Sequence, residues 1–253
     1  FRRVLRSGKP LTPALYTSQC ALVEQSDTLW AFLTCREQLA YAVDLCEPTL
    51  DATERWVATN RLLRDLGLEA CQHTKAGNAL LKGLSGGQKR RLSLGIALAK
   101  RPSIVFLDEP TSGLDAASAA KVMQLLTEVA VSQWMGVACT VHQPSSSVFA
   151  GFDQTLVLSG GRMAYLGSAA GMAPFLEAAG KPVPAGSSAA DFMLDMVNTD
   201  FVSAEEAEIV LGAWERTGNA SAPLMGDTPL LELPRTSFGE QCKILKAKHR
   251  RML

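Results

Sequence analysis

The sequence has no net charge, because 25 basic residues balance 25 acidic ones. This balance excludes a protein that binds nucleic acid through a global excess of positive charge, but it does not exclude local basic patches. Long apolar runs are also missing: none approaches the roughly 18 residues that a membrane-spanning helix needs. The chain starts without the basic and then apolar segments of a secretory leader, so no signal peptide is expected.

Cysteine pairs of the kind that bind zinc are missing as well. The six cysteines stand singly, without a C-x-x-C pair and without a Cys/His cluster at zinc spacing. Single cysteines in a chain of this length predict buried thiols in a reducing compartment, either the cytosol or a cytosolic face.

Strand and helix patterns alternate through the middle of the chain. Hydrophobic residues make up 47% of the sequence, which is enough for a packed core. The alternation predicts an α/β fold with a parallel central sheet, in which the strand at 103–107 is buried on both faces. The expected strands are residues 21–23, 103–107 and 136–141, and the expected helices are residues 34–45, 51–66, 89–100 and 116–130.

The rest of the chain has a different pattern. Residues 154–166 predict a hairpin around Gly160 and Gly161, and residues 204–217 predict a polar-faced helix. Residues 218–235 predict a linker, and residues 238–253 predict an amphipathic helix with a basic end. The tryptophans Trp30, Trp56, Trp134 and Trp214 are expected to be packing residues. Lys89, Arg90 and Arg91 predict a solvated helix face, with contact between an arginine and a phosphate as the alternative.

Two carboxylates, Asp108 and Glu109, directly follow the apolar strand at 104–107. The carboxyl edge of a parallel sheet is where α/β proteins bind ligands. One carboxylate there can bind Mg²⁺, and the next can polarise a water for attack on a phosphoryl group. A strand that simply meets a polar loop gives the same pattern, so these residues alone support both interpretations equally.

The segment Ser85-Gly86-Gly87-Gln88 precedes a helical pattern and predicts an anion site. Two glycines let a ligand approach the backbone, and a helix begins there with free N–H groups and its positive dipole end. Ser85 and Gln88 also fit the S-x-x-Q capping box of an ordinary helix start. The two interpretations are compatible.

Five motifs together resemble those of ABC-type ATPases. Residues 84–88 match the signature motif, residues 108–111 match Walker B with its catalytic glutamate, and residues 112–115 match the D-loop. His142 falls where the switch histidine belongs, and Gln25 falls where the Q-loop glutamine belongs. Four segments resemble the G subfamily, of the white–brown type, over about residues 17–200: 33–39, 83–91, 139–146 and 190–195.

The resemblance implies a P-loop NTPase-like ABC ATPase domain with a parallel central sheet and a helical signature subdomain. Its implied ligands are ATP and Mg²⁺. By this resemblance Asp108 binds Mg²⁺, Glu109 is the base that orients water, and His142 contacts the γ-phosphate. Gln25 touches Mg²⁺ or the water. The nucleotide of the opposite subunit is bound by the signature residues Ser85, Gly86, Gly87 and Gln88, and Asp115 couples the two sites.

The same resemblance implies partners and a location. The partners are a second half-transporter subunit and a membrane domain of the same polypeptide, with no nucleic acid, and the domain lies on the cytosolic face of a membrane. The implied organisation is an ABC nucleotide-binding domain at 1–200, a helix and linker at 201–235, and a connecting helix at 236–253.

One family motif is missing. No G-x-x-x-x-G-K-[ST] P-loop precedes Gln25, because Gly8 and Lys9 are followed by Pro10. With Phe1 as the first residue, truncation is a simpler explanation than a natural domain that lacks its P-loop, and this chain alone is expected to be inactive. Two alternatives are a soluble ABC ATPase acting on ribosomes or DNA and a non-catalytic partner that supplies only the signature face. A soluble ABC ATPase usually has a second ATPase cassette or long coiled-coil heptads, and this sequence has neither. A non-catalytic partner would have no need of Glu109 and His142, so their presence argues against that alternative.

Overall fold

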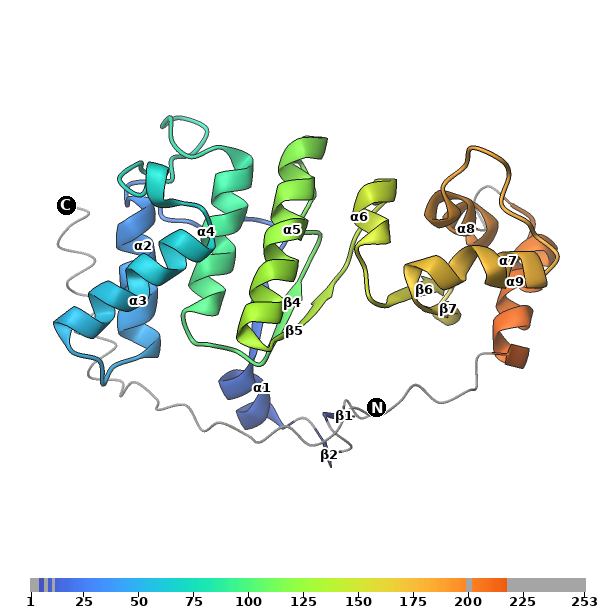
Figure 1. Ribbon diagram of the computed structural model, residues 1–253, viewed down its shortest axis with the longest axis horizontal. Coiled ribbons are helices and arrows are strands. Elements are labelled where there is room, and N and C mark those ends of the chain that lie inside the picture. The colour runs from blue at the N-terminus through green and yellow to red at the C-terminus, as the bar shows by residue number, and fades with distance from the viewer. Residues whose placement is uncertain (1–4, 7–8, 11, 199–201, 218–253) are drawn as a thin grey trace. The chain divides into compact units, whose positions relative to one another are not determined.

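The computed structural model describes residues 5–6, 9–10, 12–198 and 202–217, and the chain divides into two compact units (Figure 1). The first unit runs through Val141, and the second begins at His142.

A parallel three-stranded sheet lies in the first unit. Its order is β3 (Cys20–Val23), β4 (Ile104–Leu107), β5 (Gly136–Cys139). The last residues of the three strands are in register, because Val23 pairs with Leu107 and Leu107 pairs with Cys139. The expected α/β fold with a parallel sheet is therefore confirmed, and the loops that follow all three strands leave the sheet at one edge.

The central strand β4 is buried on one face only, which corrects the sequence-based expectation. Val105 and Leu107 are buried in the main hydrophobic core, together with side chains of helices α4 (Gly86–Leu98) and α5 (Ala116–Gln133). Ile104 and Phe106, on the opposite face, are only half-buried. There the ring of Phe106 meets Tyr16 of the short helix α1 (Pro13–Gln19), with ring centroids 6.4 Å apart.

Side-chain caps fix where the helices of this unit begin. Thr34, Asp51 and Ser85 each form a complete capping box before α2 (Cys35–Cys46), α3 (Ala52–Asp65) and α4, respectively. Helices α2, α3 and α4 pack on one another through fully buried leucines, and α4 also packs against β3 and α5 (Figure 1). The smaller elements of this unit are β1 (Leu5–Arg6), β2 (Lys9–Pro10) and the 3-10 turn η1 (Glu69–Cys71).

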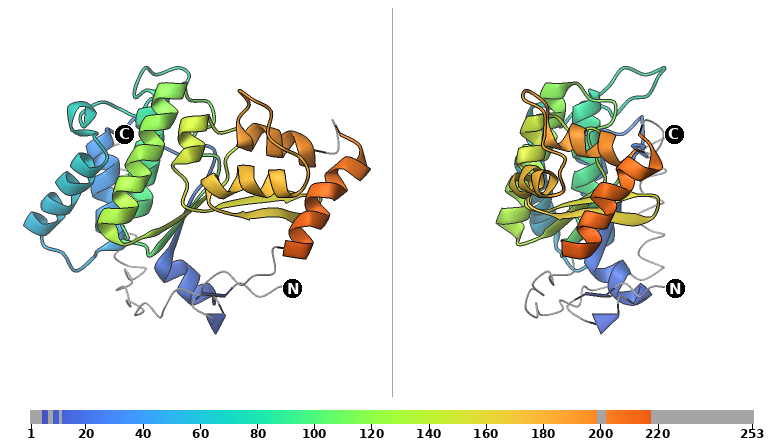
Figure 2. Two further views of the ribbon diagram at one scale, coloured as in Figure 1. Left: turned by 45° about the vertical axis from the view of Figure 1, so that its right-hand side comes forward. Right: turned by 90° about the vertical axis from the view of Figure 1, so that its right-hand side faces the viewer.

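The second unit contains the predicted hairpin and the predicted final helix. Strands β6 (Thr155–Ser159) and β7 (Arg162–Gly167) pair antiparallel around Gly160 and Gly161, and both glycines have positive φ. Helix α9 (Ala204–Thr217) packs beside β7 (Figure 2). The remaining elements are α6 (Ser146–Ala150), η2 (Ala169–Gly171), α7 (Met172–Ala178) and α8 (Ala189–Val197).

Three of the four tryptophans are not buried packing residues, which corrects the expectation for them: Trp134 is 95% exposed, Trp56 is 62% exposed and Trp30 is 45% exposed. Trp214 packs against Tyr165 and Phe175 in the second unit, so the expectation is confirmed there. Trp134 ends α5 in the left-handed region (φ +52°), and the chain returns to the core at Met135.

Part of the predicted organisation lies outside the described residues, namely the linker at 218–235 and the connecting helix at 236–253. Within the described part of the chain, none of the helices has both the length and the apolar character needed to cross a bilayer.

Candidate functional site

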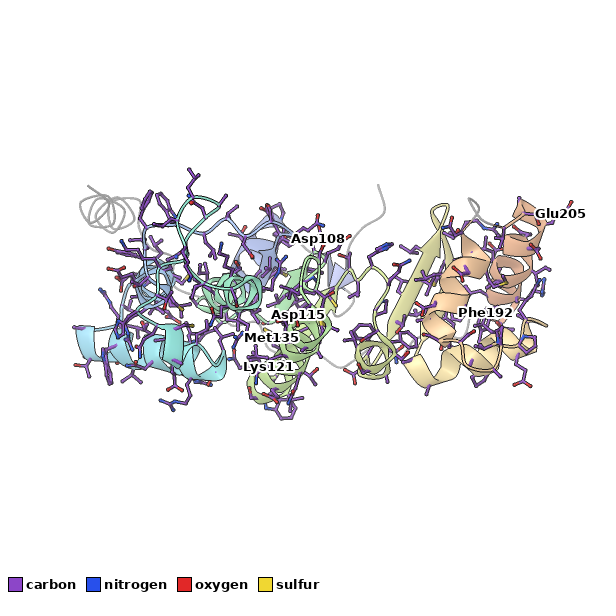
Figure 3. All side chains as sticks on the ribbon, turned by 90° about the horizontal axis from the view of Figure 1, so that it is seen from above. Asp108, Asp115, Lys121, Met135, Phe192 and Glu205 are labelled. Atoms are coloured by element: carbon purple, nitrogen blue, oxygen red, sulfur yellow. The ribbon has the colours of Figure 1, made fainter. Side chains whose placement is uncertain are left out.

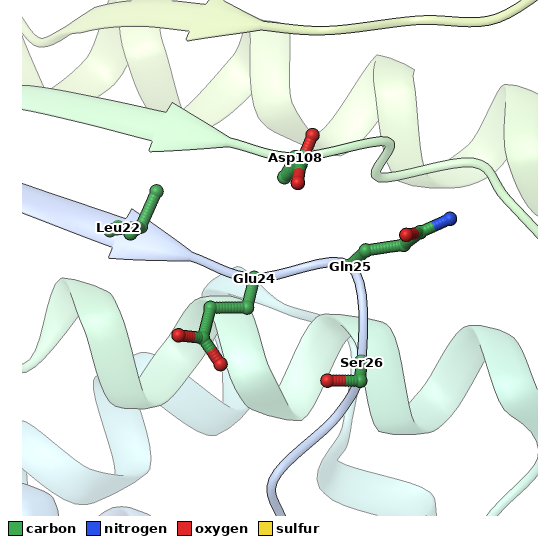
Figure 4. Close-up of a pocket in the computed structure, with 5 residues that line it drawn as sticks. All are labelled: Leu22, Glu24, Gln25, Ser26 and Asp108. Atoms are coloured by element: carbon green, nitrogen blue, oxygen red, sulfur yellow. The ribbon is translucent and has the colours of Figure 1, made fainter.

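The ends of β3 and β4 bring two predicted site residues to one edge of the sheet. The Asp108 amide donates to the Val23 carbonyl at 2.9 Å, which extends the parallel ladder by one residue beyond β4. Gln25 lies in the loop that follows β3. Gln25 and Asp108 both line an open pocket of about 600 Å³ (Figure 4). The remaining lining residues are Leu22, Glu24 and Ser26.

A hydrogen bond joins Gln25 to Glu109. The Gln25 Nε2 donates to Glu109 Oε2 at 2.8 Å and lies 3.5 Å from the Ser112 hydroxyl. Glu109 has a positive φ of 42°, an uncommon backbone conformation that recurs at functional sites. Glu109 thus combines an unusual backbone conformation with a side chain that Gln25, in the loop after β3, holds by a hydrogen bond.

Thr140, which the sequence analysis does not single out, holds both carboxylate residues in place. Its hydroxyl donates to Asp108 Oδ1 at 2.6 Å and accepts from the Glu109 amide at 2.9 Å. Thr140 follows β5, and its own amide donates to the Leu107 carbonyl. The signal that could have found it is its position one residue beyond the third strand, level with Asp108 beyond the second.

The segment Ser85-Gly86-Gly87-Gln88 forms the start of α4. The Ser85 hydroxyl accepts from the Gln88 amide, and the Gln88 side chain accepts from the Ser85 amide, so the capping-box interpretation is confirmed. Gly86 and Gly87 occupy the first two helical positions, whose N–H groups have no partner within a helix. A Cβ on Gly86 would lie 3.2 Å from the Leu114 side chain, so the glycines also let α4 approach the loop before α5.

Asp115 caps α5 with both carboxylate oxygens. One accepts from the Ser118 hydroxyl at 2.6 Å and the other from the Ser118 amide at 2.9 Å. These two hydrogen bonds stabilise the ionised carboxylate and lower the pKa of Asp115 below its usual value, with the larger effect from the Ser118 hydroxyl. Figure 3 labels Asp115 at the start of α5 and Asp108 beyond β4. Ser118 also lies 3.4 Å from where a Cβ of Gly87 would be, so Asp115 and the Ser85 segment are neighbours within one chain.

The basic residues after the Ser85 segment are not a solvated face, which corrects the expectation from the sequence. Arg90 is 4% exposed, and its guanidinium donates to the carbonyls of Glu24 and Gln25. Arg91 is half-buried and donates to the carbonyls of Leu66 and Gly67 at the end of α3. Successive residues of a helix point to different sides of it, so a basic run cannot lie on one face. Here the side chains of Arg90 and Arg91 both bind backbone carbonyls of neighbouring segments.

Comparison with known proteins decides between the families that such a site could belong to. Residues 3–112 match the model of a family described as "ABC transporter". The chain is 42% identical over 203 residues to ABC transporter G family member 13 of Arabidopsis thaliana, covering 78% of this chain and 30% of that protein. It is 37% identical over 201 residues to ATP-binding cassette sub-family G member 8 of Homo sapiens, covering 79% and 30%.

The chain belongs to the ABC transporter G family. A third relative, ABC transporter G family member STR of Petunia hybrida, is 34% identical over 239 residues, covering 92% of this chain and 29% of that protein. The chain thus spans about 30% of the length of these curated relatives. Within this family the described sheet and helices are those of an ABC nucleotide-binding domain.

In a G-family nucleotide-binding domain, the site residues of this chain fall into three groups. Gln25, Asp108 and Glu109 meet at the sheet edge, as the five-motif resemblance implies. The Ser85 segment and Asp115 meet where α4 approaches α5. His142 opens the second unit, where its side chain is exposed after β5.

The chemistry of the sheet edge suits a magnesium ion. Thr140 occupies Asp108 Oδ1, and Oδ2 accepts no hydrogen bond from the residues that the structure describes. The side-chain nitrogen of Gln25 donates to Glu109, and its side-chain oxygen is of the chemical type that Mg²⁺ prefers. Among the described residues, no group of three or more His, Cys, Asp or Glu side chains is placed to hold a metal. Mg²⁺ needs no such cage, because it takes one or two protein oxygens together with substrate phosphates and water.

Proposed function

We propose that this chain is the ATP-binding and ATP-hydrolysing part of a half-transporter of the ABC G family, which drives export of a lipid-like or amphipathic substrate across a membrane. The half-transporter pairs with a second subunit and carries a membrane domain in the same polypeptide, and this domain lies on the cytosolic face without binding nucleic acid. Family membership supports the ATPase and the pairing, and the substrate class is an implication of the resemblance alone.

One observation carries the proposed chemistry: the Gln25 amide is hydrogen-bonded to the Glu109 carboxylate at 2.8 Å, beside Asp108. In our proposal Glu109 accepts the proton of the attacking water, because a carboxylate within hydrogen-bonding reach of a water acts as a general base. Gln25 orients that carboxylate through its amide N–H. Thr140 prevents rotation of Asp108 and fixes the backbone at Glu109.

Asp108 and Gln25 would hold Mg²⁺, which when bound supplies positive charge that offsets the charge on the phosphate oxygens. The other roles belong to the paired form. The amides of Gly86 and Gly87 and the Ser85 hydroxyl would bind the terminal phosphate of the partner's nucleotide, since a helix N-terminus favours an anion. His142 would donate a hydrogen bond to the γ-phosphate of the nucleotide that its own subunit binds, as the resemblance implies.

The test is a double-mutant cycle on ATP hydrolysis by the transporter that includes this chain. Glu109→Gln and Gln25→Ala are measured singly and together. Because Gln25 orients Glu109 through one hydrogen bond, part of the loss in Gln25→Ala is already contained in Glu109→Gln, so the double variant should be faster than the product of the two single losses predicts. Glu128→Gln, an exposed glutamate of α5 that accepts from Gln124, is the matched control and should leave turnover unchanged. If the two losses multiply, the two residues act independently and this mechanism is wrong.

A further inference from the structure

Arg90 is a buried charge that the proposed mechanism does not use. It lies on α4, about one turn after the Ser85 segment, and its side chain is 4% exposed. Burying a guanidinium is costly unless its donors are paired. Here Nη1 donates to the Glu24 carbonyl at 2.7 Å, and Nη2 donates to the Gln25 carbonyl at 2.5 Å. The planar guanidinium therefore grips two successive carbonyls of the loop that presents the Gln25 side chain.

Asp27 strengthens this grip from the side of the loop. Its carboxylate lies 3.5 Å from Arg90 Nη1 and is 20% exposed. The same carboxylate oxygen accepts from the Ser93 hydroxyl at 2.8 Å, and Ser93 lies one turn after Arg90 on α4. Two side chains of α4, Arg90 and Ser93, thus hold the loop at residues 24–27. Their partners are the carbonyls of Glu24 and Gln25 and the carboxylate of Asp27.

Arg91, the next residue on α4, shows that this arrangement is specific to Arg90. Its Nη1 donates to the carbonyls of Leu66 and Gly67 at 2.9 and 3.0 Å, and its Nε lies 3.3 Å from the Gly87 carbonyl. These partners lie at the end of α3 and within α4 itself. Both arginines use charge-assisted hydrogen bonds to backbone carbonyls, but only Arg90 binds the Gln25 loop.

We propose that Arg90 is a positioning residue that fastens the Gln25 loop to the helix that starts at Ser85, so that the loop and the start of this helix move as one body. The inference rests on the proposed function, in which Gln25 serves the nucleotide of its own subunit and the Ser85 segment serves the nucleotide of the partner. A shift at one nucleotide is then passed through Arg90 to the other, and the two sites of the paired transporter respond together.

The anchoring half is tested on this chain with a glutamyl endopeptidase, which cuts after Glu24 only when the loop leaves α4. Cleavage at this bond is followed by mass spectrometry in the wild type, Arg90→Met and the control Arg91→Met. Arg90→Met should be cut about tenfold faster or more, because it loses hydrogen bonds from a charged donor, while Arg91→Met stays near the wild type. Arg90→Lys, which keeps the charge but loses the fork, should fall between them.

Equal cleavage in the two methionine variants would overturn the anchoring. If thermal melting shows that Arg90→Met does not fold, Asp27→Ala is judged in the same assay, because it removes the loop's carboxylate partner for both Arg90 and Ser93. Wild-type cleavage at Glu24 in Asp27→Ala would contradict the proposal, and faster cleavage would support it.

The coupling half is tested by the ATP dependence of hydrolysis in the paired transporter. The wild type and Arg91→Met should show a sigmoidal dependence, and Arg90→Met should show a hyperbolic one. A role confined to stability would lower the amount of active enzyme without changing the shape of the curve. A sigmoidal curve in Arg90→Met, or a hyperbolic one in the wild type, would overturn the coupling. A wild type without any ATP hydrolysis would instead refute the proposed function, and the protease result would still decide the anchoring.

Discussion

Replacing Thr140 with valine is the perturbation whose consequences follow most directly from the geometry of the site. Valine keeps the shape but removes the hydroxyl that donates to Asp108 Oδ1 at 2.6 Å and accepts from the Glu109 amide at 2.9 Å. A hydrogen bond to a charged group contributes roughly 1.5–3 kcal/mol and a neutral one roughly 0.5–1.5 kcal/mol. Because Thr140 is exposed, water replaces part of both. We therefore expect the free energy of unfolding to fall by only about 1 kcal/mol.

The effect on hydrolysis should exceed this effect on stability. Without the hydroxyl, Asp108 rotates freely and the backbone at Glu109 loses a tether, so both carboxylates leave their working positions. We expect ATP hydrolysis by the transporter to fall about tenfold, equivalent to about 1.4 kcal/mol in the barrier. Urea unfolding of this chain gives the first quantity, and steady-state phosphate release gives the second. Thr127→Val, which removes an exposed hydroxyl bonded to the Met123 carbonyl on α5, is the matched control. Unchanged hydrolysis in Thr140→Val would refute the reasoning.

Three further predictions test other parts of the account. The chain alone should show no steady-state ATP hydrolysis, because no P-loop motif is present to hold the β-phosphate; turnover that Glu109→Gln abolishes would contradict this. Ser85→Arg should leave thermal melting within a few degrees, because losing an N-cap costs about 1 kcal/mol, yet it should block ATP-dependent dimer closure; if melting and closure fall together, the cap alone explains Ser85. Burial, together with the neighbouring Cys71, raises the pKa of Cys35 to about 12, so the thiol stays protonated at pH 8. Iodoacetamide at pH 8 should therefore not label Cys35 in the folded chain. Equal labelling of Cys35 in the folded and the urea-unfolded chain would contradict this.

The parts of the fold that local chemistry decides could be predicted from the sequence. Thr34 and Ser85 start helices because each has its capping partner three residues later. The turn at Gly160 needs a positive φ, which glycine adopts without strain, so the hairpin is visible as a sequence pattern. The sheet-edge site was also predictable in outline, since Gln25 and Asp108 follow parallel strands, whose carboxyl ends lie at one edge of the sheet.

Other features depend on contacts that no local pattern contains. Thr140 acts on Asp108 only because β5 pairs with β4 in a particular register, which the apolar runs do not specify. Arg90 was expected to be solvated, since a basic run usually is; its burial results from the loop after β3 crossing that face of α4. Helix α1 is not among the helices expected from the sequence, although Thr12 caps it and Pro13 at the first helical position needs no N–H partner.

The central claim is that Glu109 is the base for ATP hydrolysis, and one measurement on Glu109→Gln in the paired transporter tests it most directly. The amide keeps the shape of the side chain but cannot accept a proton, so chemistry should suffer more than binding. ATP retained by the protein and phosphate released from it are measured on the same sample. We expect release to fall on the order of 10²-fold or more while ATP remains bound as in the wild type. Near-normal phosphate release would remove Glu109 from this role.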